Sequence, residues 1–321
     1  MRKGNDTQPG VDGKTERGEV EVGGQTIGYT LHEVDARSES QRTASARDRT
    51  LDGNLNVYVP GHGQTVTAAR NLIARIIALS SSKVLWAIDI DPPRGGDAAR
   101  AEALIEIIKK KASQGLFGSE GQEAAEPPFF RVTIFGWSHG GAEAMRAAAK
   151  APALFQQVVG LCPAGLTKRS PSELAWSFVL ECWRIFRDAL PRFDRTTVRV
   201  LAMGYDLQAG VFRDLLRSKS LRRVINDIRW ACGKVTGEDY EYDGMVVILF
   251  GEDDGVIRWR DAFPACQHPG NIGPFLEEYK KRDFPIARGL QVRVLEGSHV
   301  APETHAPLYV KTAFDLLEKK S

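Results

Sequence analysis

The sequence predicts an α/β protein in which a mostly parallel sheet carries helices on both faces. Segments typical of strands alternate with segments typical of helices over much of the chain, and such alternation produces a parallel sheet. Residues 245–250, MVVILF, form a continuous apolar run, as expected for a strand that is buried on both faces. With 321 residues, of which 42% are hydrophobic, the chain is long enough for one large core and an insertion.

The expected elements follow one another in a regular order after residues 1–18, which we expect to be a flexible tail. Residues 19–22 and 26–33 flank a Gly-Gly pair, and this pattern predicts an antiparallel hairpin. Strands and helices are then expected at residues 56–59, 67–79, 84–90, 98–112, 130–135, 140–150, 157–161, 245–250, 290–295 and about 307–319.

The alternation stops between residues 166 and 243, where helical patterns predict a cap inserted into a main domain of residues 19–165 and 244–321. The first cap helix begins with the capping box Ser170-Pro171-Ser172-Glu173 and extends to about Leu190. Apolar side chains surround nearly its whole circumference, so we expect this helix to be buried on every side. One of its faces either lines a substrate pocket or packs only against other cap helices. The candidates for lining a pocket are its aromatic residues Trp176, Phe178, Trp183 and Phe186.

A serine lies at the sharp joint between a predicted strand and a predicted helix. The joint reads Gly136-Trp137-Ser138-His139-Gly140, after a run of strand formers and before an alanine-rich run. Glycine is needed at positions 136 and 140 because a side chain there would collide with the adjoining strand or helix. Such a strained turn exposes the hydroxyl, which predicts that Ser138 is a nucleophile.

A serine hydroxyl needs a base to take its proton, and the base needs a third group to hold its tautomer. The apolar run 245–250 ends in Gly251-Glu252-Asp253-Asp254, so carboxylates follow the carboxyl end of a predicted parallel strand. The strand expected at residues 290–295 is followed by Glu296-Gly297-Ser298-His299. The order along the chain is therefore serine, acid and histidine, with the acid open between Asp253 and Asp254.

Upstream, the segment Val57-Tyr58-Val59-Pro60-Gly61-His62-Gly63-Gln64 reads as a strand that leads into a glycine-rich loop. With this segment included, the chain from about Glu19 onward resembles the α/β-hydrolase family, in particular serine esterases and lipases with a helical cap. The resemblance implies that Asp254, in preference to Asp253, is the acid and that His299 is the base. It also implies an oxyanion hole built from the backbone N–H groups of Gln64 and His139.

The function implied by this resemblance is that of a serine hydrolase. Such an enzyme would cleave a carboxylic ester, or a thioester or lactone, of a lipophilic small molecule through an acyl-enzyme on Ser138. An acyltransferase or a carbon-carbon bond hydrolase would use the same three residues, so both stay open. The alternative from a different class is a non-catalytic ligand-binding protein on the same fold, which would not need all three groups.

Composition excludes several other classes. The histidines are scattered and no Cys-x-x-Cys occurs, so we expect neither a metal nor another cofactor. A net charge of +2 gives no reason to expect nucleic acid as a partner. No apolar stretch is long enough to span a bilayer, and the N-terminus lacks the apolar core of a secretory signal. The widely spaced cysteines Cys162, Cys182, Cys232 and Cys266 read as buried thiols, so we expect a soluble, cytoplasmic protein.

Overall fold

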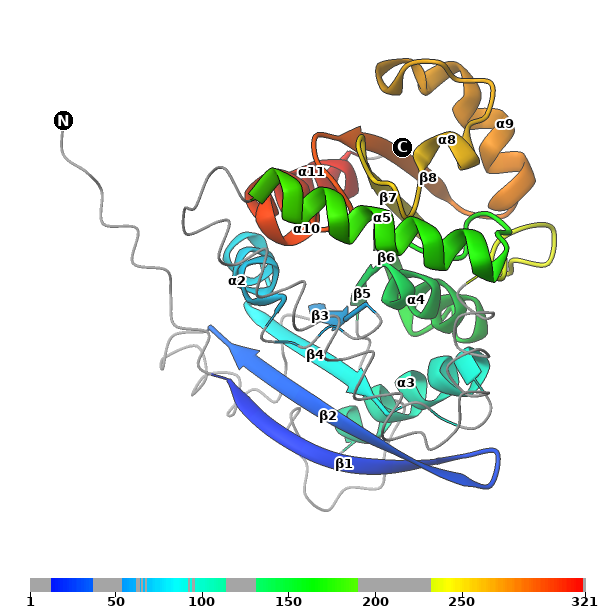
Figure 1. The fold of residues 1–321 in the computed structure, drawn as a ribbon. Coiled ribbons are helices and arrows are strands. Elements are labelled where there is room, and N and C mark those ends of the chain that lie inside the picture. Colours follow the sequence, from blue (N-terminus) through cyan, green and yellow to red (C-terminus); the bar gives the residue numbers. More distant parts are fainter. Residues whose placement is uncertain are drawn as a thin grey trace.

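A computed structural model of the chain (Figure 1) describes residues 13–36, 54–61, 64, 66, 68–91, 93, 96–113, 131–189 and 232–319. Its centre is an eight-stranded sheet with the strand order β1-β2-β4-β3-β5-β6-β7-β8. The strands are β1 (Lys14–Val22), β2 (Gln25–Asp35), β3 (Asn54–Val59), β4 (Val84–Ile90), β5 (Arg131–Trp137), β6 (Phe155–Leu161), β7 (Met245–Gly251) and β8 (Gly289–Leu295). β2 pairs antiparallel with both β1 and β4, and the remaining pairs are parallel. The predicted mostly parallel α/β sheet is therefore confirmed.

The hairpin predicted at the start of the chain is present, but its first strand is longer than expected. β1 begins at Lys14, so residues 14–18 are strand and only residues 1–12 of the expected tail lie outside the described chain. Residues 14–18 carry exposed or half-buried side chains and show no apolar alternation. They pair instead through the backbone ladder with the stretch from Tyr29 to Glu33. An edge strand held in this way leaves little signal in the apolar pattern.

Helices cover both faces of the sheet (Figure 1). The helices on one face, α3 (Gly96–Ser113) and α4 (His139–Lys150), pack in a single core cluster with residues of α8 (Trp259–Ala262) and α9 (Gly273–Asp283). On the other face α2 (Arg70–Leu79) and α11 (Ala306–Glu318) form a second cluster, beside the short helix α10 (Ala301–Thr304). Successive residues of β7 point alternately into the two clusters, which is why its sequence is apolar throughout.

The first helix of the predicted cap is α5 (Pro171–Ala189), and the rest of that insertion, residues 190–231, lies outside the described residues. The predicted capping box is formed: Ser170 Oγ accepts from the Glu173 N–H at 3.2 Å, and Glu173 Oε2 accepts from the Ser170 N–H at 3.1 Å. None of the helices in the described ranges is long and apolar enough to cross a membrane.

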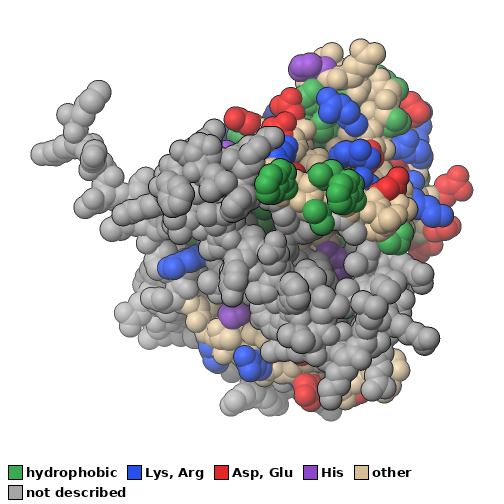
Figure 2. Space-filling model, viewed as in Figure 1, with side chains coloured by type: hydrophobic (Ala, Val, Ile, Leu, Met, Phe, Trp, Pro, Cys, Tyr) green, Lys and Arg blue, Asp and Glu red, His purple; other side chains and the backbone are tan. Residues whose placement is uncertain are grey.

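The expectation that α5 is buried on every side is wrong. Trp176, Val179, Leu180 and Trp183 are 50–63% exposed, and Figure 2 shows hydrophobic side chains at the surface over this helix. These four positions share one helical face, whereas the buried Glu181 lies on another. The helix turns its Glu181 side toward the loops after β7 and β8, and the apolar stripe consequently faces outward. The side chains of Phe178 and Phe186 lie outside the described residues.

Candidate active site

Ser138 stands at the joint between β5 and α4 with a strained backbone. Its φ is 53° and its ψ is −121°, in a region that residues with a side chain rarely adopt. The flanking glycines allow the close approach that this turn requires. A Cβ at Gly136 would collide with the backbone of Gly140, and a Cβ at Gly140 would collide with the carbonyl oxygen of Val59. The collisions expected from the sequence are therefore found with both the helix and a neighbouring strand.

The structure brings Ser138, His299 and Asp254 together from three separate parts of the chain. Ser138 Oγ lies 2.9 Å from His299 Nε2, and His299 Nδ1 lies 2.8 Å from Asp254 Oδ2. The hydroxyl, the imidazole and the carboxylate thus form one continuous chain of hydrogen bonds. Ser138 directly follows the parallel strand β5, and Asp254 and His299 lie in the short loops after β7 and β8. All three therefore meet at the edge of the sheet where the carboxyl ends of these strands lie.

Of the two adjacent aspartates, Asp254 is the one that contacts the imidazole. Its side chain is buried, whereas Asp253 is exposed. Asp254 Oδ1 also accepts hydrogen bonds from the backbone N–H groups of Val256 and Ile257, both at 2.8 Å. Both carboxylate oxygens of Asp254 are therefore fixed, one by the loop that follows it and one by His299.

The surroundings of His299 act on its pKa in opposite directions. Burial disfavours the charged imidazolium and lowers the pKa, whereas the charge of Asp254, its hydrogen bond to the ring and the charge of Glu181 raise it. The raising contributions prevail, so the pKa of His299 lies above its ordinary value. A raised pKa makes the imidazole a stronger base toward the hydroxyl of Ser138.

The backbone of His299 is held on both sides by side chains from other elements. Trp137 Nε1, from the end of β5, donates to the His299 carbonyl oxygen at 3.1 Å. The His299 N–H donates to Glu181 Oε1 of α5 at 3.0 Å. The imidazole is thus positioned by the residue before Ser138 and by a helix of the predicted cap.

The two residues expected at an oxyanion hole differ in how they are held. His139 is the first residue of α4, where helix N–H groups have no partner within the helix and the helix dipole is positive. Its imidazole Nδ1 lies 2.9 Å from Glu143 Oε1, and the same buried oxygen lies 2.5 Å from Arg100 Nε of α3. Gln64, in contrast, donates its backbone N–H to the Gly61 carbonyl oxygen at 3.1 Å. That bond would have to open before Gln64 could serve an oxyanion.

Gln64 also contacts its own loop through its side chain. Its Oε1 accepts from the Gly61 N–H and from the Tyr58 hydroxyl, both at 3.0 Å. The side chain therefore holds the loop after β3 in a tight turn beside Ser138, since a Cβ at Gly61 would lie 3.2 Å from the Cβ of Ser138. His62 and Gly63 lie outside the described residues.

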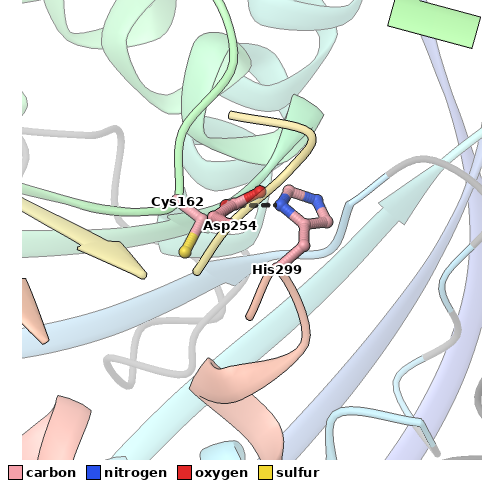
Figure 3. Close-up of side chains that lie close together, drawn as sticks. All are labelled: Cys162, Asp254 and His299. Carbon is pink, nitrogen blue, oxygen red and sulfur yellow. Dashed lines mark hydrogen bonds and ion pairs between the residues drawn. The ribbon is translucent and has the colours of Figure 1, made fainter. Parts of the chain in front are cut away.

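Cys162 follows β6 and lies beside the acid (Figure 3). Among the described residues, ligand atoms of Cys162, Asp254 and His299 lie within 4.8 Å of one another, as a metal site would require. Burial, and next the charge of Asp254, raise the pKa of the Cys162 thiol well above its usual range. A metal needs the thiolate, and Asp254 and His299 already bind each other, so this chemistry fits an acid and base pair better than a metal site.

The four aromatic residues expected to line a pocket are not all placed. Trp176 and Trp183 are exposed on the outer face of α5.

The structure also identifies Glu181, a residue that was not predicted from the sequence to belong to the site. Its signal was present, because a single carboxylate in an otherwise apolar stretch of helix must find a partner when it is buried.

Comparisons with known proteins agree with this architecture at low sequence identity. No protein-family model matches the sequence, and no curated protein matches it. A peroxisomal alpha-beta-hydrolase from Saccharomyces cerevisiae is similar with a TM-score of 0.55 and 12% identity, over 97% of this chain and 91% of that one. An N-formylmaleamic acid deformylase from Pseudomonas putida S16 gives a TM-score of 0.54 and 14% identity, over 94% of this chain and 100% of that one. A hydrolase from Pseudomonas aeruginosa gives a TM-score of 0.58 and 11% identity, over 94% of this chain and 98% of that one. The chain therefore has the α/β-hydrolase fold.

Proposed function

We propose that this protein is a serine hydrolase that cleaves a carboxylic ester of a lipophilic small molecule through an acyl-enzyme. The observation that carries the proposal is the hydrogen-bonded chain from Ser138 through His299 to Asp254, with Ser138 on a strained turn. A binding protein has no use for this arrangement, because neither the strained turn nor the buried acid improves a pocket.

In the proposed first half-reaction, Ser138 Oγ attacks the carbonyl carbon of the ester, and its proton passes to His299 Nε2. The negative charge of Asp254 stabilises the imidazolium that forms and holds the ring in the required tautomer. The carbonyl oxygen becomes an oxyanion, which the N–H of His139 and, after release from Gly61, that of Gln64 would stabilise. The tetrahedral intermediate then collapses, and the leaving alcohol takes the proton from His299.

The second half-reaction regenerates the enzyme. Water donates a proton to His299 Nε2 while its oxygen attacks the acyl carbon, and a second tetrahedral intermediate forms. Its collapse breaks the bond to Ser138 Oγ, which recovers the proton from the imidazole and releases a carboxylic acid. Thioesters and lactones fit the same sequence of steps. An acceptor other than water would make the protein an acyltransferase.

The proposed substrate is lipophilic because helix α5, the first element of the proposed cap over residues 166–243, is rich in aromatic residues. Trp176, Phe178, Trp183 and Phe186 are the proposed contacts with its acyl or alcohol portion. We also propose a cytoplasmic location, because Cys162, Cys232 and Cys266 are buried free thiols, as in proteins of reducing compartments.

A panel of p-nitrophenyl esters of graded acyl length, assayed beside thioesters and lactones, tests the proposal. We expect turnover with a preference for longer acyl chains, and an initial burst of p-nitrophenol if release from Ser138 is slow. Substitution of the exposed Ser172 by alanine serves as the control and should leave turnover unchanged. Binding of these esters without any release of p-nitrophenol would show a ligand-binding protein instead.

A further inference from the structure

The described side chains of helix α5 are distributed unusually between its inward and outward faces. Among its described side chains, Glu181 is the one that is buried, with 4% of its surface exposed. The apolar residues Trp176, Val179, Leu180 and Trp183 face outward. A helix is normally attached through its apolar face, whereas the described contacts of Glu181 on the inward face of α5 are polar.

The contacts of Glu181 reach both loops that carry the acid and the base. Its Oε1 accepts the backbone N–H of His299 at 3.0 Å. Its Oε2 lies against the loop after β7, where a Cβ at Gly255 would lie 3.0 Å from it. Arg184, one turn along the helix, donates to Glu181 Oε1 at 2.9 Å and balances its charge.

A second polar contact joins the same helix to the same loop. Arg169, just before α5, donates through Nη1 to the Val256 carbonyl oxygen and through Nη2 to Ser177 Oγ at 3.3 Å. Val256 is the residue whose N–H is bound by Asp254 Oδ1. The inward face of α5 is therefore tied to the acid loop through Arg169 and to the base through Glu181.

We propose that Glu181 is a positioning residue for His299, through which the position of α5 against the loops after β7 and β8 sets the base opposite Ser138. The proposal rests on the proposed function, in which His299 takes the proton of Ser138. With Trp137 on the carbonyl side and Glu181 on the N–H side, the peptide groups of His299 are fixed at both ends. When α5 is displaced, the N–H loses its acceptor and the imidazole loses a neighbouring negative charge.

The charge of Glu181 gives this role a signature that a purely structural contact lacks. The titratable groups that the described residues place against the imidazole are Asp254 after β7, Cys162 after β6 and Glu181 of α5. A nearby anion favours the imidazolium, so Glu181 raises the pKa of His299. Removal of that charge lowers the pKa, and the neutral base is then present at lower pH. The acid limb of kcat/KM therefore moves to lower pH.

The test compares Glu181→Gln, Glu181→Ala and the control Glu173→Gln in the full-length chain. Glu181→Gln keeps an acceptor for the His299 N–H, so kcat on the pH plateau should stay within about threefold of wild type while the acid limb moves to lower pH. Glu181→Ala removes acceptor and charge, and kcat should fall about ten- to a hundredfold because the base is misplaced. Glu173 is an exposed acid on the same helix, and its substitution should leave the acid limb in place.

Titration of the imidazole by NMR separates this proposal from the proposed function. The pKa of His299 should fall in Glu181→Gln and stay in place in Glu173→Gln, whether or not the protein turns over an ester. If the alanine variant does not fold, the glutamine variant alone decides. An unchanged His299 pKa, or variants of Glu181 that lower only the melting temperature, would overturn the proposal. Absence of turnover in the wild type with a shifted pKa would overturn the proposed function alone.

Discussion

The turn around Ser138 and the helix α5 approach the same histidine, but their described contacts differ in kind. The turn lies between β5 and α4, whose inward side chains are buried in apolar clusters on the two faces of the sheet. Helix α5 exposes an apolar stripe and buries a carboxylate. Burial in the core fixes the turn at Ser138, whereas the described contact of α5 with His299 is a directional hydrogen bond.

This difference predicts where the protein is rigid and where it can be adjusted. Close packing tolerates little displacement, so the turn at Ser138 should keep its geometry in every state of the protein. Each hydrogen bond or ion pair at a half-exposed helix contributes less to the free energy of unfolding than close packing does, and it can be exchanged for a bond to water. We therefore expect substitutions at the turn to act on chemistry or folding, and substitutions on α5 to act on substrate preference and pH dependence.

The largest expected effect is that of Ser138→Ala. Removal of the proposed nucleophile should lower kcat by roughly a millionfold, because the proposed acyl-enzyme forms on this hydroxyl. The melting temperature should change little, because the hydroxyl contributes little packing and its hydrogen bond to His299 is only partly buried. Steady-state kinetics and thermal melts measure both. A variant that retains a tenth of the wild-type rate would show that Ser138 is not the nucleophile.

The next effect separates the two adjacent aspartates. Asp254→Asn should lower kcat by about ten-thousandfold, because an amide can hold the imidazole in the wrong tautomer. Asp253→Asn is the matched control, since Asp253 is exposed and His299 contacts its neighbour. Parallel kinetics of the two variants provide the comparison, and a larger loss at position 253 would reverse the assignment.

The packing of the turn predicts an effect on stability. Gly140→Ala places a methyl group against the carbonyl oxygens of Val59 and Pro60 and should lower the free energy of unfolding by about 1–3 kcal/mol. Gly273→Ala in α9 is the control, because a Cβ at Gly273 meets nothing within 4 Å and should be neutral. Urea denaturation measures the difference. Equal stability of the two variants would mean that the turn is not closely packed.

The smallest effect is expected on α5. Trp176→Ala and Trp183→Ala should leave the melting temperature unchanged, because both side chains are exposed. If they contact the substrate, KM for long-chain esters rises about tenfold for each 1.4 kcal/mol of lost burial, and KM for acetate esters does not. Kinetics with both ester lengths test this. Unchanged preference in both variants would place the lipophilic pocket elsewhere.

The parts of this structure that could be predicted from the sequence are those specified by local chemistry. Gly136, Ser138 and Gly140 define their own turn, and the ends of parallel strands are bound to meet at one edge of the sheet. The meeting of Ser138, Asp254 and His299 follows from that rule, while their catalytic roles stay predictions. Whether Gln64 serves the oxyanion also stays a prediction, and its bond to Gly61 is a feature of loop geometry that no motif encodes.

The parts that could not be predicted depend on contacts between distant segments. Glu181 and His299 are 118 positions apart, and nothing in the local sequence of either indicates the other. The apolar pattern of α5 predicts that the helix is buried, but it does not predict which of its faces is turned toward the loops after β7 and β8. The strand at residues 14–18 was missed for a related reason, because an exposed edge strand is specified by its partner's backbone.

The central claim, that Ser138 is a nucleophile activated by His299 and Asp254, is tested most directly by covalent labelling with a fluorophosphonate. The intact protein is treated with the probe, and the modified peptide is mapped by mass spectrometry. We predict one adduct per chain, located on Ser138, with labelling abolished in Ser138→Ala and strongly slowed in Asp254→Asn. An unlabelled wild-type protein, or an adduct on another residue that persists in Ser138→Ala, would contradict the claim.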